Sequence, residues 1–287
     1  MSFVEAELAS QPDCWRAAAR LAIDVRDLLP VRGQRVAAVG CGTSWFISRG
    51  YAGLRETLGV GETDAFAASE YPAGRRYDRV VAITRSGTTT EVLDLLRGLG
   101  TPYTVLVGDP SSPAARLGGD VVALPFADER SVVQTRFATS VLMLLRASLG
   151  QAVVDPTEAL AAPLPVDPSS VEQVTFLGRG WTVGLAEEAA LKCREAAGCW
   201  AEAYPAMDYR HGPISIAQPG RVVWALGEVP ARLAADVAAT GATFVYHPDR
   251  DPLAELVLAQ RFAVALAVHR GLDPDAPRHL TRSVVLR

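Results

Sequence analysis

The sequence predicts an α/β protein made of two similar halves, each a parallel sheet flanked by helices in three layers, as in flavodoxin. Three observations predict this. Short apolar segments alternate with amphipathic helical segments, which indicates βαβ units. The stretch VTFLGRGWTVGLAEEAALKCRE repeats the layout of VAAVGCGTSWFISRGYAGLRE, with Gly178 following Gly40 by 138 positions. A proline-rich stretch separates the two copies.

In the first half, residues 11–29 are expected to form a helix, because apolar side chains recur there at spacings of three and four. Further helices are expected over 42–59, after residue 84, and near 131–149. Short apolar runs bounded by polar residues or glycine predict buried strands. These runs are residues 35–40, 64–70, 79–84, 103–108 and 120–125.

The domain organisation follows from the repeat and from the prolines. We expect an N-terminal domain at 1–150, a linker at 151–170, where four prolines disfavour a continuous helix, and a C-terminal domain at 171–287. The strand RVVWALG at 221 echoes RVVAITRSG at 79. The second copy lacks the hydroxyl-rich turn, having Gly227 and Glu228 in its place.

Composition excludes several classes of protein. The net charge is −4 and no block of Lys or Arg occurs, so no nucleic-acid partner is expected. No apolar run long enough to span a membrane and no basic N-terminal region are evident, which predicts a cytoplasmic protein without a membrane partner. The four cysteines show no CxxC spacing and the four histidines no i, i+4 pair, so reduced thiols and no metal or cofactor are expected.

The segment AITRSGTTTEVLDLL, residues 82–96, is the strongest candidate for a binding loop. Five hydroxyl side chains lie in the seven residues from Thr84 to Thr90, directly after a buried strand and before a helix. A helix N-terminus offers unpaired N–H groups and the positive end of the helix dipole, Gly87 permits close approach, and Arg85 adds charge. The segment therefore predicts a phosphate-binding loop; the alternative is an ordinary helix cap.

A second glycine-rich turn, GCGTS at residues 40–44, follows a neighbouring strand. Two such turns would lie at the carboxyl edge of one sheet, where open α/β folds bind ligands. The third glycine of the dinucleotide fingerprint is absent and no GxxxxGK[ST] motif occurs, which argues against a NAD-dependent dehydrogenase and against a P-loop.

Taken together, these motifs resemble a known family. VGCGTS, AASEY, AITRSGTTTEVLDLL and ERSVVQTRFATSVLMLL have the order and spacing of a sugar isomerase (SIS) domain. The stretch LGRGWTVGLAEEAALKCREAAGCWAEAYPAMDYRHGPISI and the tail DAPRHLTRSVVL resemble the isomerase half of glucosamine-6-phosphate synthase. The similarity runs from about residue 35 to 287. It implies a tandem SIS protein, related to phosphosugar isomerases and deaminases, that forms a homodimer with a shared active site.

The resemblance also implies roles for individual residues. The phosphate would bind Thr84, Arg85, Ser86 and Thr89. Glu195 corresponds to the general base of the related enzymes. His211 corresponds to their ring-opening histidine, which the partner subunit supplies. Sugar contacts would come from Cys41, Gly42, Thr43, Ser44, Gln134, Glu188, Lys192 and Arg282.

The chemistry supports these roles but leaves alternatives open. A carboxylate placed above two adjacent carbons can remove a proton and return it, and a histidine that titrates near neutrality suits ring opening. Glu188 and Lys192, four residues apart, could equally form a surface ion pair, and Glu195 could be a solvated helical glutamate. Cys41 has no paired histidine in sequence reach, so a packing role is expected for it rather than nucleophilic catalysis.

The sequence departs from the synthase at one position of the tail. Arg282 stands where the synthase carries a lysine that handles the open-chain sugar through an imine. Arginine stays charged and cannot form that imine, so amination is disfavoured. We therefore expect a phosphosugar isomerase or an aminosugar-6-phosphate deaminase/isomerase without amidotransferase activity. The alternative is a non-catalytic SIS protein that binds or senses phosphosugars.

Overall fold

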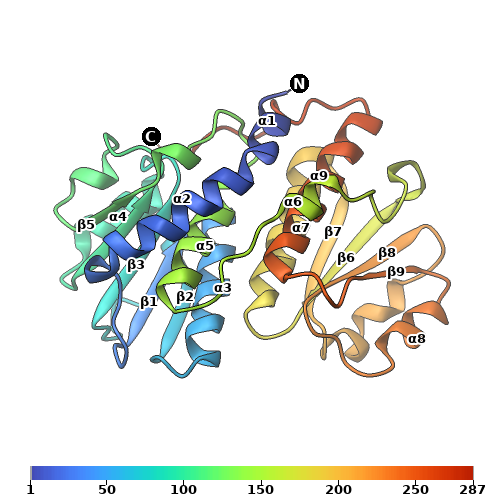
Figure 1. Cartoon of the computed structure of the whole chain (residues 1–287), viewed down its shortest axis with the longest axis horizontal. Coiled ribbons are helices and arrows are strands. Elements are labelled where there is room, and N and C mark those ends of the chain that lie inside the picture. Colours follow the sequence, from blue (N-terminus) through green and yellow to red (C-terminus); the bar gives the residue numbers. More distant parts are fainter. Residues whose placement is uncertain (1, 287) are drawn as a thin grey trace. The chain divides into compact units, whose positions relative to one another are not determined.

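The computed structural model describes residues 2–286 and divides them into two compact units, each built on its own parallel sheet (Figure 1). The first-sheet unit comprises residues 10–130, 134–155 and 281–286, and the second-sheet unit comprises 2–9, 131–133 and 156–280. The predicted boundaries differ from this division, because both chain ends pack with the opposite half of the sequence. The crossing at Asp155–Pro156 lies inside the predicted linker.

The sheet of the first-sheet unit has the strand order β2-β1-β3-β4-β5, with every neighbouring pair parallel. This is the flavodoxin order, and it confirms the predicted fold class. The order reverses between β1 and β3, so the loops after these two strands flank the crevice where such sheets bind ligands. The strands are β1 (Val36–Gly40), β2 (Thr63–Ala67), β3 (Arg79–Thr84), β4 (Tyr103–Val107) and β5 (Asp120–Ala123).

Helices cover both faces of this sheet, which explains the almost continuous apolar strands. Alternate side chains such as Val39 and Val80 pack in one cluster with Val92 of α4, while the intervening residues, such as Ala38, are equally buried toward the opposite face. There α3 contacts β1, and α5 contacts α3 and α2. The helices are α2 (Gln11–Asp24), α3 (Thr43–Thr57), α4 (Thr90–Gly98) and α5 (Arg136–Ser148).

Three predicted elements differ from the structure by three or more residues at one end. The helix predicted to Leu29 ends at Asp24, and a 3₁₀ turn, Arg26–Leu28, follows it. The strand predicted for 64–70 ends at Ala67, where another 3₁₀ turn begins. The helix predicted near 131 begins only at Arg136.

The late start of α5 has a structural reason. Residues 131–133 cross to the second-sheet unit, where the Ser131 hydroxyl donates to the carboxylate of Glu7 in α1 (Phe3–Ala9). Apolar composition alone could not reveal that contact.

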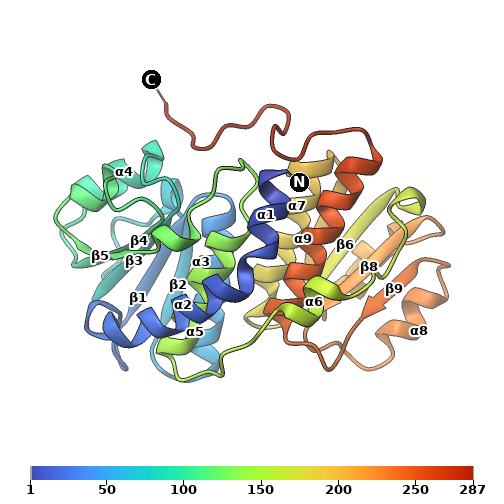
Figure 2. The ribbon, with the colours of Figure 1, turned by 45° about the horizontal axis from the view of Figure 1, so that its top comes forward.

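The second sheet repeats the topology with one strand fewer, in the order β7-β6-β8-β9, again all parallel. Its elements are α6 (Thr157–Ala161), β6 (Gln173–Gly178), α7 (Thr182–Ala197), β7 (Trp200–Pro205), β8 (Arg221–Leu226), α8 (Leu233–Ala238), β9 (Thr243–Tyr246) and α9 (Pro252–His269). Helices α7 and α9 pack side by side (Figures 1 and 2). The buried ring of Trp224 lies 5.7 Å from the rings of Phe176 and Phe262.

Helix α9 is long and apolar enough to span a membrane by length and composition, which the sequence analysis did not expect. It is the one such helix within residues 2–286. However, 72% of it is buried in the structure, and it packs against α7 and α6. Its apolar composition is therefore accounted for by burial in the core of the second-sheet unit.

Two glycine-to-alanine variants test the strand–turn–helix packing. A Cβ at Gly178 would lie 2.3 Å from the carbonyl oxygen of Thr182, whereas a Cβ at Gly98, at the end of α4, would meet nothing within 4 Å. We expect Gly178→Ala to destabilise the protein by about 1–3 kcal/mol or more through overpacking. Gly98→Ala should be neutral or stabilising by up to about 1 kcal/mol. Thermal unfolding of both variants tests this expectation, and equal unfolding midpoints for the two variants would contradict it.

Candidate functional site

The predicted phosphate-binding loop leaves the carboxyl end of β3 and enters α4. Thr84 and Arg85 are buried, and Ser86, Thr88 and Thr89 are partly buried. Gly87 has a positive φ of 62°, and a Cβ there would lie 2.1 Å from the hydroxyl oxygen of Ser112. Only glycine fits this position, because both the backbone conformation and the space exclude a side chain.

The structure brings this loop together with the turn after β1. Gln134 also lines the cavity formed there, and its amide oxygen is buried with no hydrogen-bond partner in the described part of the chain. Gly42 and Thr43 belong to the same turn but do not line the cavity. A cavity of about 30 Å³ is lined by Cys41, Ser44, Ile83, Thr84, Arg85, Ser86, Thr89, Val92, Gln134 and Arg282.

Cys41 lies in the wall of this cavity as a neutral thiol. Burial, with a smaller contribution from the negative charge of Glu91, raises the pKa of Cys41 to about 11. The thiolate is therefore scarce at neutral pH, which agrees with a packing role and disfavours nucleophilic catalysis.

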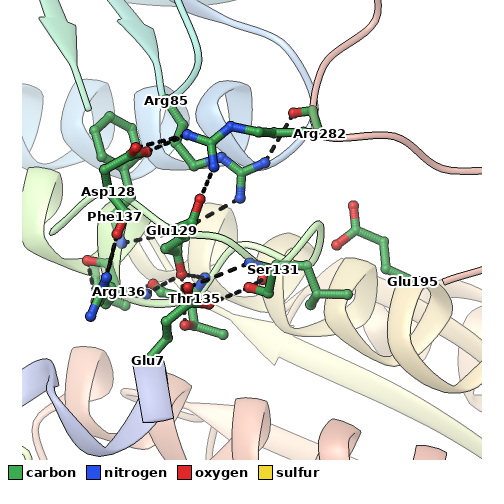
Figure 3. A network of polar contacts seen from close by, with 12 residues as sticks. Glu7, Arg85, Asp128, Glu129, Ser131, Thr135, Arg136, Phe137, Glu195 and Arg282 are labelled. Atoms are coloured by element: carbon green, nitrogen blue, oxygen red, sulfur yellow. Dashed lines mark hydrogen bonds and ion pairs between the residues drawn. The ribbon is translucent and has the colours of Figure 1, made fainter. Parts of the chain in front are cut away.

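A buried ion pair lies behind the loop. The guanidinium of Arg85 is 3.9 Å from the carboxylate of Glu129, and the two side chains are 1% and 0% exposed (Figure 3). Arg85 also donates to the carbonyl of Arg282 at 2.9 Å. Arg85, which is predicted to bind phosphate, therefore contacts other groups of the protein in this structure.

Glu129 connects the ion pair to the start of α5. Its carboxylate accepts hydrogen bonds from the backbone N–H groups of Thr135 at 2.6 Å, Arg136 at 2.9 Å and Phe137 at 3.3 Å. These donors belong to the first turn of a helix, which has no intrahelical partners for them. Glu129 therefore caps α5 and fixes the backbone next to Gln134. Sequence reasoning missed this residue, although an acid shortly before an apolar helix was a usable signal.

The tail of the chain lies over the loop. In the tail, Arg282 donates to both carboxylate oxygens of Asp128, at 2.6 and 2.8 Å, and also to the carbonyl of Glu129 (Figure 3). The N–H of Thr90 donates to the carbonyl of Val284 at 3.1 Å. The hydroxyls of Thr88 and Ser283 form a further hydrogen bond of 2.9 Å.

These contacts leave little room beside the loop. A water needs at least ~10–15 Å³, so a cavity of this size holds about one or two waters and no phosphorylated sugar. No phosphorylated sugar fits beside the loop while the tail occupies this position. The ion pair between Arg282 and Asp128 is partly exposed, so its own contribution to holding the tail is small.

The second-sheet unit carries the candidate base on α7. The ammonium nitrogen of Lys192 lies 2.5 Å from the carboxylate of Glu195 and 3.3 Å from that of Glu188. Lys192 is 1% exposed, Glu188 is 0% exposed and Glu195 is 19% exposed. The alternative of a surface ion pair between Glu188 and Lys192 is therefore wrong, because both partners are buried.

His211 lies in a 3₁₀ turn, Tyr209–His211, and is exposed. The turn is anchored by Tyr209, which is fully buried in a core cluster with Leu177 and Val223. Burial raises the pKa of Tyr209 to about 12, with smaller contributions from Glu202 and Tyr204. The buried ring fixes the turn while the imidazole two residues later faces solvent.

The corresponding crevice of the second sheet contains an ion pair in place of hydroxyls. Arg179 after β6 and Glu228 after β8 are 2.5 Å apart and largely exposed. Thr182 is buried here and donates to the carbonyl of Leu226 at 2.7 Å. Among its described residues, the second-sheet unit therefore has no counterpart of the hydroxyl-rich loop at its topological switch point. Within residues 2–286 no group of three or more metal-ligating side chains occurs.

Comparison with known proteins finds relatives of this chain that contain SIS domains. No family model matches it. It is 28% identical over 295 residues to glutamine–fructose-6-phosphate aminotransferase (isomerizing) of Sulfurisphaera tokodaii, a match that covers 88% of this chain and 50% of the relative. Its homologues are the SIS domains of these aminotransferases. The chain spans about half the length of the curated relatives it matches.

Solved structures share the SIS fold over nearly the full chain. Glucosamine-6-phosphate deaminase from Thermotoga maritima superposes with a TM-score of 0.82 at 24% identity, covering 99% of this chain and 100% of that one. Tagatose-6-phosphate ketose/aldose isomerase from Escherichia coli gives a TM-score of 0.75 at 18% identity, with 99% and 96% coverage. The two parallel sheets described above therefore form the same α/β fold as these two proteins.

A substitution of Glu129 tests the buried ion pair of the first SIS sheet. Glu129→Ala leaves a buried guanidinium uncompensated and the first turn of α5 uncapped, so we expect it to cost about 3–5 kcal/mol of unfolding free energy. The control is Asp94→Ala, which breaks a largely exposed pair with Arg97 and should cost under about 0.5 kcal/mol. Denaturant unfolding measures both; similar losses would show that the buried pair has no special weight.

Proposed function

We propose that the chain is an enzyme acting on a 6-phosphosugar, by aldose–ketose isomerisation or by deamination/isomerisation of an aminosugar phosphate, with Glu195 as the base. The observation that carries the proposal is the arrangement on α7. A carboxylate at the helix end is held by an ammonium that is itself fully buried and shared with a second carboxylate. Burying such a group costs several kcal/mol, which favours a functional role for this cluster over a purely structural one.

The proposal assigns phosphate binding to the loop from Thr84 to Thr90. Its support is the concentration of hydroxyls at the start of α4 and the glycine that no other residue can replace. When the tail moves, the N–H of Thr90 loses the carbonyl of Val284 and becomes a donor at the positive end of the helix dipole. An incoming phosphate would take the place of that carbonyl.

Proton transfer is assigned to Glu195. Once the sugar ring has opened, a carboxylate can remove the proton from the carbon next to the carbonyl and return it to the neighbouring carbon. Lys192 orients Glu195 through its short ion pair. The imidazole of His211, which faces solvent on an anchored turn, is assigned to ring opening and is proposed to act in the site of a second subunit of a homodimer.

The alternative is a protein that binds phosphosugars without converting them. The closed tail favours this second candidate, because a ligand that displaces the tail would report its own presence by a change of shape. The two candidates differ in one observable, the exchange of sugar protons with solvent.

Glu195→Gln tests the proposed base. Candidate 6-phosphosugars incubated in deuterium oxide with the wild type should gain label at C1 or C2. The variant should lose activity by about 10²–10⁴-fold, the usual contribution of a general base. Glu172→Gln, an exposed carboxylate of the same unit, is the matched control and should keep the wild-type rate. Phosphosugar binding without exchange in the wild type would establish the binding protein; ammonia release from glucosamine-6-phosphate would identify a deaminase.

Mixing two inactive variants tests the shared site. Subunits carrying Glu195→Gln and subunits carrying His211→Ala should each be inactive, yet after co-refolding about a quarter of the wild-type activity should return, because half of the dimers are mixed and each has one intact site. A mixture that stays as inactive as its components, while forming mixed dimers, would place His211 and Glu195 in the same subunit's site.

A further inference from the structure

A cavity of about 650 Å³ lies within the second-sheet unit, where α7 ends. One wall is the last turn of α7 with Gly198. The other wall is the segment that leaves the end of α9 in Figure 2, with residues 270–273 and 276–279. Glu195 of α7 and His279 of this segment both line the cavity. Its volume falls within the range of small-molecule sites, so it is large enough for a sugar beside Glu195.

Contacts with two helices hold the segment after α9 in place. Arg270, at its start, donates to the carbonyl of Ala197 at the end of α7, at 3.0 Å. The carboxylate of Asp275 accepts from the N–H groups of Phe3 at 2.6 Å and Val4 at 2.8 Å, in the first turn of α1. These N–H groups have no partner inside the helix, so Asp275 caps α1. The wall that ends in His279 is therefore anchored on both sides of Asp273.

His279 has an unusual backbone conformation. Its φ is 63°, in the left-handed region. Among the non-glycine residues within 2–286, only Arg232 shares a positive φ. This conformation costs free energy for a residue with a Cβ, persists only where the surrounding structure determines it, and is concentrated at functional sites. The fold thus holds this histidine in one defined backbone conformation at the cavity.

The proposed isomerisation still needs a group that moves protons at the sugar oxygens. When Glu195 removes a proton from carbon, the carbonyl oxygen gains an electron pair and must be protonated. Besides Glu195, the ionisable side chains that line the cavity are Arg194, Arg270, Asp273, Arg278 and His279. Arginine does not release its proton, and the carboxylate of Asp273 already accepts from the N–H of Asp275 at 2.9 Å. Among these side chains, an imidazole is the type that both gives and takes a proton near neutral pH.

We propose that His279 moves the proton between the two sugar oxygens while Glu195 moves the proton between the two carbons, an inference that rests on the proposed function. Glu195 takes the proton of the carbon next to the carbonyl, the C–H electrons form a C=C bond, and the carbonyl oxygen takes a proton from the imidazolium. The neutral imidazole then takes the proton of the neighbouring hydroxyl. The carbonyl re-forms there, and Glu195 returns its proton to the other carbon. Both residues end as they began, and both belong to the same subunit, while ring opening stays with His211.

Replacement by glycine, with imidazole added back, tests this role. His279→Gly removes the imidazole and suits the positive φ. On the phosphosugar that the wild type converts, kcat should fall ~10²–10⁴-fold while KM stays within about threefold, and free imidazole should restore kcat at least about tenfold. His269→Gly is the matched control, because His269 is an exposed histidine at the end of α9 that does not line the cavity. It should keep the wild-type rate with and without imidazole.

A pH profile gives a second readout, and it replaces the first should His279→Gly fail to fold. A protonated acid predicts that kcat of the wild type falls as the pH rises through the pKa of that acid. His279→Asn should lose this fall, because asparagine tolerates a positive φ but does not titrate.

The outcomes separate this inference from the function on which it rests. Full activity of His279→Gly, a loss that imidazole does not restore, or an unchanged pH profile in His279→Asn would each overturn the role of His279 alone. A wild type that converts no phosphosugar would overturn the proposed function, and this inference with it.

Discussion

The buried pair of Arg85 and Glu129 is the interaction on which the candidate phosphate site depends. Both side chains are almost completely buried, so each charge must be compensated inside the protein. Glu129 meets this demand with the guanidinium and with three backbone N–H groups at the start of α5. By doing so it joins the loop after β3 to the helix that follows Gln134. Glu129 does not line the cavity, yet its contacts fix the position of the backbone that does.

The second-sheet unit uses the same principle in another place. Lys192 is buried between two carboxylates, and the more exposed of these, Glu195, is the candidate base. At the crevice where the first sheet carries hydroxyls, the second has the exposed pair Arg179 and Glu228. One duplicated topology thus presents two different sets of side chains. The first unit offers neutral donors at a helix start, suited to an anion, and the second offers a fixed carboxylate, suited to moving a proton.

The tail shows why the site could be predicted only in part. The hydroxyls from Thr84 to Thr90 form a local pattern, and the strand and helix that flank them follow from apolar periodicity, so the loop was recognisable in the sequence. The partners of that loop are remote along the chain. Asp128 binds Arg282, which is 154 residues away, and Val284 accepts from Thr90 across 194 positions. No spacing rule connects such residues, and neither Asp128 nor Glu129 stood out among the acids of the chain.

The sequence by itself determined the α/β class, the duplication, the strands and the two turns at the sheet edge, because alternation of short apolar and amphipathic segments is a local property of the chain. It also placed Glu188, Lys192 and Glu195 on one helix. Only the tertiary structure decided which of those charges are buried, where α5 begins, and that both chain ends pack with the opposite half of the sequence. These depend on desolvation and on contacts between distant segments, which exist only once the chain has folded.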